Sequence, residues 1–240
     1  MSTVSRAADA RAPRSSDSPD QRAELQALAE EVVTRAVKAG ADGAEVLVRA
    51  GSELEVKVRL GKPELVHEAR SRGLGLRVVR DQRSAVTYTS DFSPEALARF
   101  VDSSIELSQL SEPDELGGLP DRSEVIPPGT VLPDLGMWDE AALALTAKDA
   151  LDQALAAEAA AMAYSNKVTN SDGASFSRGV GSSALALADR AGLLFSGASR
   201  GTYQALTAEA ICDDEGGKKR NASYWTAGSF FSSLLDPAAV

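Results

Sequence analysis

The sequence predicts an α+β fold in which helices pack on antiparallel β-meanders. Apolar residues recur at helical spacing in three segments, and apolar and polar residues alternate in the shorter segments between them. Parallel βαβ units are not visible. The order is helix, meander, helix and then helix, meander. We therefore expect one unit with two halves, and the second half could be a degenerate repeat of the first, although no residue-level motif recurs.

The first predicted helix begins at Ser18-Pro19-Asp20-Gln21, which offers an N-cap, a proline at the first helical position and a capping-box glutamine. Its apolar residues keep helical spacing until Gly40. Alternating segments then predict strands at 44–50, 53–60, 64–70, 74–80 and 84–90, with turns at Gly51-Ser52, Gly61-Lys62, Arg72-Gly73 and Asp81-Gln82.

A second helix is predicted from Ser93-Pro94, and a proline-rich stretch, 111–138, follows it as an ordered irregular connection. The alanine-rich segment 139–163 predicts one long helix. Strands are then expected at 164–170, 174–180, 182–189, 193–199 and 202–211, with turns at 170–173 and 189–192. We divide the chain into a disordered leader (1–19), a first half (20–110), the connection (111–138) and a second half (139–240).

The composition excludes several classes of function. A net charge of -10 opposes binding to nucleic acid, and no basic patch compensates for it. The chain has one cysteine, no secretory signal in its first 20 residues and no run of 18 apolar residues. These features predict a soluble cytoplasmic protein that binds neither nucleic acid nor membrane.

The only histidine, His67, is followed by Glu68 and so begins like the zinc motif H-E-x-x-H. The fifth position is Ser71, and the segment alternates like a strand, in which neighbouring side chains point to opposite faces. We predict that His67 is a sheet-surface residue and that the chain holds no metal and no cofactor of its own.

Other motifs also favour structural roles. Residues 197–201 match G-x-S-x-G around Ser199, but no histidine follows that could activate the serine. Gly73-Leu74-Gly75 lacks the third glycine and the helix of a dinucleotide site. Asp213-Asp214-Glu215 reads as a solvated turn, and Cys212 as a small packing residue. We predict no catalytic, metal-binding or cofactor-binding residue.

Three stretches together resemble the amino-terminal region of the TldD/PmbA metallopeptidase family. The first, 39–121, contains ADGAEV, GLGLRV, TSDFSPEAL and GLPD; the second, 164–209, contains the turn NSDG between strands; the third is the closing SSLLDPAAV. The resemblance covers about residues 20–240.

The resemblance implies a cytoplasmic system in which a TldD-type and a PmbA-type (TldE) subunit form a proteolytic dimer that acts on unfolded peptides. The family's metal-binding H-E-x-x-x-H belongs to the TldD type, in a region with no counterpart here. We therefore expect the substrate-enclosing and assembly part of such a peptidase, predicted inactive by itself. The alternative is a stand-alone binding or regulatory module that pairs with a full-length relative.

Overall fold

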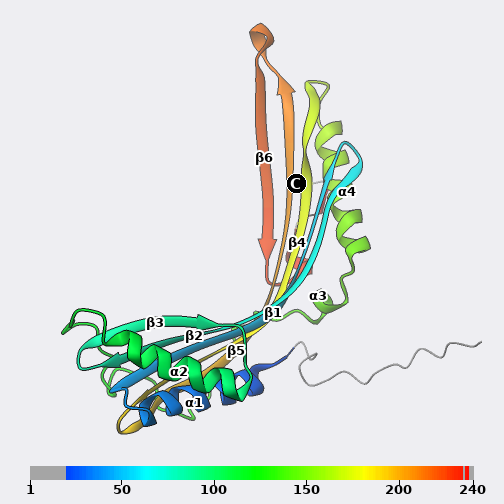
Figure 1. Ribbon diagram of the computed structural model, residues 1–240. Helices are drawn as coiled ribbons and strands as arrows, with labels where there is room; N and C mark the ends of the chain where they lie inside the picture. Colours follow the sequence, from blue (N-terminus) through cyan, green and yellow to red (C-terminus); the bar gives the residue numbers. More distant parts are fainter. Residues whose placement is uncertain (1–19, 235, 238–240) are drawn as a thin grey trace, which may run out of the picture.

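The computed structural model describes residues 20–234 and 236–237, so the predicted leader lies outside the described residues. All strands join one antiparallel sheet in the order β3-β2-β1-β4-β5-β6 (Figure 1). The predicted α+β fold is confirmed. The elements are α1 (Arg22–Lys38), β1 (Gly43–Arg59), β2 (Lys62–Arg80), β3 (Arg83–Thr89), α2 (Pro94–Ser108), α3 (Glu140–Ala144), α4 (Ala147–Ala163), β4 (Val168–Asp189), β5 (Gly192–Asp213), β6 (Lys219–Gly228) and two short 3-10 helices, η2 (Glu215–Gly217) and η3 (Phe231–Ser233).

The strand order is symmetric about the central pair β1 and β4. The hairpin β1–β2 is followed outward by β3, and the hairpin β4–β5 is followed outward by β6. A helix precedes each hairpin in the chain. The repeated element order suggested by the sequence is therefore present in the topology.

The long strands bend together, and this bend replaces two of the predicted turns (Figure 1). Strand β1 runs through Gly51-Ser52, and β2 runs through Arg72-Gly73, so both turn predictions are wrong. Gly51 lies opposite Gly181 of β4, and a Cβ on Gly51 would lie 2.7 Å from the carbonyl oxygen of Val180. Glycine is used here because two backbones approach closely, not because the chain reverses.

A third predicted turn, 170–173, is also wrong: β4 continues through it with irregular pairing to β5. Gly173 has φ +111°, and a Cβ on it would lie 2.5 Å from the carbonyl oxygen of Val58. The asparagine, serine and glycine thus form a β-bulge within the strand. The predicted turns at 81–82 and 189–192 do connect strands, and the turn predicted at 61–62 lies one residue earlier, at 60–61.

All four α-helices pack on one face of the sheet, on the outside of the bend (Figure 1). We call this the covered face and the opposite one the open face. Even-numbered residues of β1, β4 and most of β5 point to the covered face and form two separate apolar cores. One core lies under α1 and α2 and the other under α4.

The two cores divide the molecule into two arms. The α1–α2 arm contains residues 43–50, 72–80, 83–89, 182–189 and 192–200 of the strands. The α4 arm contains 52–59, 62–70, 168–180, 202–213 and 219–228. Each arm therefore combines segments from both ends of the chain.

The predicted long helix 139–163 is interrupted at Leu145-Thr146, so that prediction is wrong in part. The Thr146 side chain accepts a hydrogen bond from the Asp149 amide, and the Asp149 carboxylate accepts one from the Thr146 amide. The two bonds form a capping box that starts α4. Arg178 of β4 donates from Nη1 to the carbonyl oxygens of Ala142 and Leu145, at 3.3 and 3.2 Å. These contacts stabilise the end of α3 separately from α4.

Helix α1 also begins later than predicted, at Arg22. Asp20 does not continue into the helix because its carboxylate accepts hydrogen bonds from the amide and the Nε of Arg22. The amide of Gln21 donates to Ser182 Oγ at 3.2 Å, which fixes the start of the helix on β4. Helix α2 begins as predicted, with Ser93 before Pro94.

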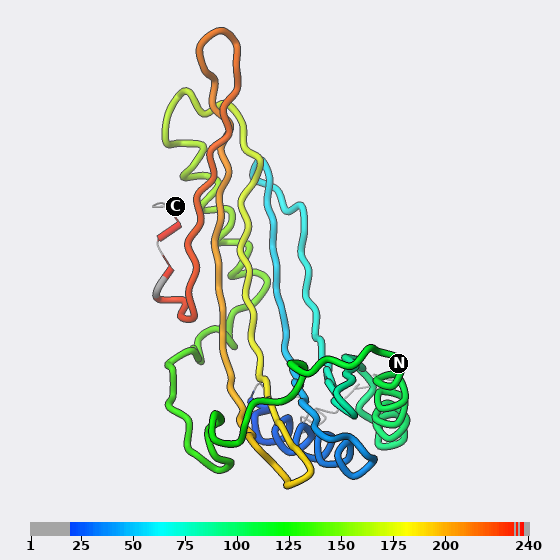
Figure 2. The backbone as a smooth tube through the Cα atoms, turned by 90° about the vertical axis from the view of Figure 1, so that its left-hand side faces the viewer, coloured from blue at the N-terminus to red at the C-terminus, as the bar shows by residue number. Residues whose placement is uncertain are grey.

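The proline-rich connection contains no helix or strand, as predicted, and it crosses the open face of the α1–α2 arm (Figure 2). Arg77 of β2 donates to the carbonyl of Gly117, and Arg122 donates to that of Leu193 at 3.0 Å. The amide of Thr202 donates to the carbonyl of Met137 at 2.8 Å. This arm is therefore covered on both faces, whereas the α4 arm has a helix on one face only.

Candidate functional site

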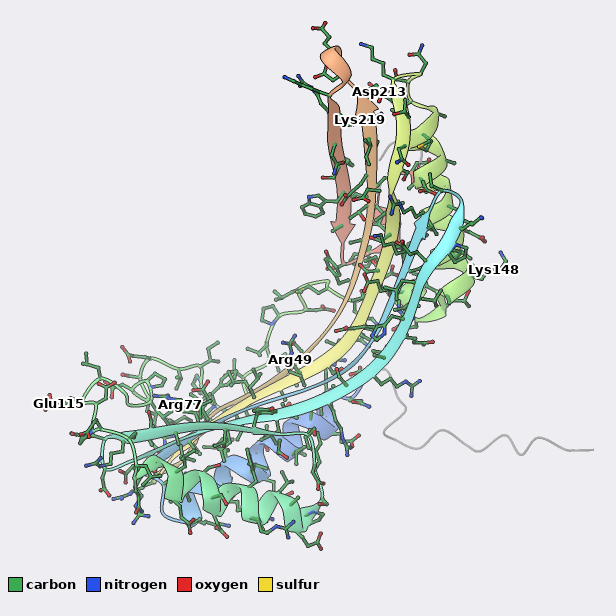
Figure 3. All side chains as sticks on the ribbon, turned by 45° about the horizontal axis from the view of Figure 1, so that its top comes forward. Arg49, Arg77, Glu115, Lys148, Asp213 and Lys219 are labelled. Atoms are coloured by element: carbon green, nitrogen blue, oxygen red, sulfur yellow. The ribbon has the colours of Figure 1, made fainter. Side chains whose placement is uncertain are left out.

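The open face of the α4 arm and of the bend is the candidate site, because it forms a concave surface that none of the described helices covers (Figure 1). Its central residues on β4 are small: Ser175, Ser177, Gly179, Gly181 and Ser183 point to it. Small side chains leave the backbone of the central strands accessible to a bound chain. Figure 3 shows Arg49 where the sheet bends and Asp213 and Lys219 at the far tip of the α4 arm.

Two large aromatic side chains stand at the β5–β6 side of this surface. Tyr203 of β5 is 50% exposed, and Trp225 of β6, opposite Thr207, is 65% exposed. Ala205 and Ala227 lie opposite each other between them. Two aromatic residues separated by alanines form a shallow apolar surface that the side chains of an extended peptide can contact.

Charged residues occupy the β1–β2 side. Glu55 lies opposite His67. The next residue of β1 on the open face, Lys57, forms an ion pair of 3.1 Å with Glu64. The candidate surface therefore has an apolar side and a charged side, separated by serines and glycines.

His67 lies on β2 and is exposed, so the prediction of a sheet-surface histidine is confirmed. Within this strand Glu68 points to the opposite face from His67, and Ser71 lies opposite Gly51. The residues of the apparent H-E-x-x-H motif therefore do not converge on one point.

Ser199 lies in the middle of β5 and not on a turn before a helix. Its Oγ is 3.0 Å from Ser183 Oγ on the neighbouring strand, and two strands, β4 and β1, separate β5 from the strand of His67. The arrangement gives the serine a hydroxyl partner and no base.

The remaining motifs are structural as well. Gly73-Leu74-Gly75 lies inside β2, with Leu74 in the core. Cys212 is half-buried near the end of β5. Asp213 and Asp214 lie at the exposed β5–β6 tip, where hydrogen bonds from Lys219 and Arg220, respectively, lower the pKa of each carboxyl. The predicted solvated turn is confirmed.

Within residues 20–234 and 236–237, no three histidine, cysteine, aspartate or glutamate side chains gather closely enough to hold a metal ion. In the same part of the chain, no helix is long and apolar enough to cross a membrane.

One buried carboxylate that we did not single out from the sequence stabilises the geometry of the α4 arm. Glu158 of α4 is 3% exposed and accepts hydrogen bonds from the amides of Leu60 and Gly61, both at 2.8 Å, and from Ser171 Oγ at 2.6 Å. Burial raises the pKa of Glu158, but these hydrogen bonds together lower it by more, so its pKa lies below the ordinary value. The only signal for it in the sequence is that a glutamate occupies a position where helical spacing predicts a buried residue.

Comparison with known proteins agrees with this fold. Residues 44–108 match the family described as "PmbA/TldA metallopeptidase domain 1". Over 216 residues the chain is 28% identical to the metalloprotease PmbA of Escherichia coli O157:H7, covering 89% of this chain and 46% of that protein. It is 33% identical over 161 residues to a PmbA homologue of Haemophilus influenzae, covering 67% of this chain and 34% of the homologue.

The chain belongs to the PmbA/TldD metallopeptidase family. The expected resemblance to its amino-terminal region is confirmed. The chain spans less than half the length of the two PmbA relatives.

A solved structure shows the same fold. A protein of Bacteroides thetaiotaomicron, described as a candidate modulator of DNA gyrase, superposes with a TM-score of 0.76 at 22% identity, covering 90% of this chain and 48% of that one. The part that matches the PmbA/TldD family description contains β1, β2, β3 and α2, and the relatives extend the match toward β4 and β5.

Proposed function

We propose that this chain is the substrate-enclosing and assembly part of a PmbA/TldD-type peptidase system. In this role its open face holds an unfolded peptide, and a metal-containing family member supplies the catalytic site. The chain itself contributes no metal ligand or catalytic residue. We place the system in the cytoplasm because the chain has a single cysteine and so forms no internal disulfide.

The concave open face of the α4 arm is the observation that carries the proposal. The described helices pack only on the covered face of the sheet, on the outside of its bend. The open face is therefore available to a ligand (Figure 1). The row of serines and glycines on β4 admits a polypeptide backbone, and the aromatic pair Tyr203 and Trp225 offers contacts that do not depend on sequence. Both properties suit unfolded peptides of varied composition.

Peptide binding at this face is tested with an unstructured peptide that carries a benzophenone photo-crosslinker. We expect cross-links to β4, β5 and β6, located by mass spectrometry. Trp225→Ala should weaken peptide binding about fivefold, because an aromatic contact contributes about 1 kcal/mol. The control is Tyr224→Ala, since Tyr224 is the adjacent residue on the other face of β6 and is 49% exposed.

Equal effects of the two substitutions, or cross-links only outside the sheet, would contradict peptide binding at the open face. Assembly is tested separately, by light scattering of the chain alone and mixed with a TldD-type family member. We expect a complex with that partner. A complex that forms but leaves peptide cleavage by the partner unchanged would favour the alternative, a binding module without a role in substrate enclosure.

A further inference from the structure

A second surface, on the covered face, has the properties of a ligand site. A cavity of about 690 Å³ lies at the outside of the bend, between the start of α1 and the junction of α3 and α4. It lies between the two apolar cores, and leucines that belong to or pack on each core contribute to its lining. Its lining includes Arg70, Arg72, Arg178, Leu54 and Leu145.

Arg178 is the central group of this cavity. It is 8% exposed, and it donates from Nη1 to two carbonyl oxygens, whereas its Nε has no hydrogen-bond partner. Burial lowers the pKa of Arg178, although the Glu68 carboxylate, which also lines the cavity, acts on the guanidinium in the opposite direction. A buried guanidinium with an unpartnered donor is costly unless an anion compensates its charge.

Two of the three long helices of the covered face, α1 and α4, begin at the cavity. Gln21 and Glu24 at the start of α1, and Thr146 and Ala147 at the start of α4, belong to its lining. The positive end of each helix dipole therefore faces the same space as the arginines. These features attract an anion despite the two lining carboxylates, Glu24 and Glu68.

The apolar part of the lining determines what kind of anion fits. Leucines from β1, α1 and the α3–α4 junction line the cavity, and Arg72 stacks on the ring of Phe92 at 4.7 Å. An inorganic anion would leave these side chains without contacts. A ligand with one carboxylate and branched apolar groups would satisfy both parts of the wall.

We propose that this cavity binds an organic carboxylate with apolar side chains, such as the carboxyl terminus of a short peptide, with Arg178 as its main anion-binding residue. The site is separate from the open face, so it does not depend on the function proposed above.

Isothermal titration of the full chain with acetyl-leucyl-leucine, and with its carboxamide as the uncharged control, tests the proposal. We expect the acid to bind at least about tenfold more tightly than the amide, because the amide loses the charge-assisted contact with arginine. Equal binding of the two, or no binding of the acid, would overturn it.

Variants locate the site. Arg178→Gln should weaken binding of the acid about tenfold or more and Arg72→Gln less, whereas Arg99→Gln, on the exposed side of α2, should leave it unchanged. Because Arg178 also stabilises the end of α3, Ala144→Trp provides a second test: Ala144 is exposed and lines the cavity, so the indole should block it without disturbing the core. A folded Ala144→Trp variant with unchanged affinity for the acid would overturn the proposal.

Discussion

The two arms share the same central strands but differ in how they are stabilised. The α1–α2 arm has two helices on one face and the proline-rich connection on the other, and its core combines leucines and valines with alanines. The α4 arm has one helix of alanines against the sheet, one large aromatic residue in its core and an open inner face. The α4 residues that face the sheet are small, so the helix lies close to the strands. We therefore expect the stability of this arm to depend on a few side-chain contacts in its core. The arm proposed to hold a peptide is thus the one with the fewer covering layers.

The largest expected effect of a single substitution in the α4 arm is that of Phe176→Ala. Phe176 is fully buried and contacts Phe231 edge to face, with ring centroids 6.1 Å apart. Its loss should lower the free energy of unfolding by about 4 kcal/mol, measured by urea denaturation. The matched change in the other arm, Val46→Ala, should cost about half as much because fewer atoms are removed. A larger loss of unfolding free energy for Val46→Ala than for Phe176→Ala would contradict this expectation.

The next effect is that of Glu158→Gln, which should destabilise the chain by about 2 to 3 kcal/mol because two backbone amides and a buried serine lose a charged acceptor. The control is Asp152→Asn on the same helix, an exposed residue paired with Lys148, for which we expect less than about 0.5 kcal/mol.

The same carboxylate predicts a dependence of stability on pH. The pKa of Glu158 is lower in the folded than in the unfolded chain, so its contribution is complete above the unfolded-state pKa and is lost as the pH falls through the folded-state pKa. The stability difference between wild type and Glu158→Gln should therefore shrink on acidification from pH 6 toward values below the ordinary glutamate pKa of about 4.3. A difference that grows on acidification would contradict the lowered pKa.

A smaller effect is expected at the bend. Gly51→Ala should destabilise by about 2 kcal/mol, because its Cβ would lie 2.7 Å from a carbonyl oxygen and the backbone must shift. Gly73→Ala, close by on β2 with nothing within 4 Å of its Cβ, should be neutral or slightly stabilising. Thermal unfolding of the two variants distinguishes a bend that requires glycine from one that tolerates any residue.

The smallest expected effect concerns the connection. Arg122 donates to the carbonyls of Leu193 and Gly192 and pairs with Asp189 at 2.7 Å, but it is about half exposed. Arg122→Ala should change the global stability by less than about 1 kcal/mol. It should nevertheless increase hydrogen exchange in residues 116–135 and leave α4 unchanged. Faster exchange throughout the α4 arm would show that the connection stabilises both arms.

Much of the local structure was determined by the sequence alone. Helix α2 begins after Ser93, and the reversal at 81–82 uses residues with positive φ. The alternation in 53–60 predicted the burial of Leu54, Val56 and Val58 correctly, whereas Leu60 lies in the turn and is exposed. The exposed position of His67 was predicted as well. These features follow from interactions between residues close together in the chain, whose preferences a single segment expresses.

The tertiary structure decided the role of the glycines and the position of the candidate site. A Gly-Ser pair is equally compatible with a tight turn and with a close approach between strands, and only the contact of Gly51 with β4 selects the second. Likewise, the end of α3 is held by Arg178, a residue more than 30 positions away from Leu145. The open face and the cavity at the bend both arise from strands that pair across long sequence separations, so their residues have no common pattern that a local reading of the sequence could detect.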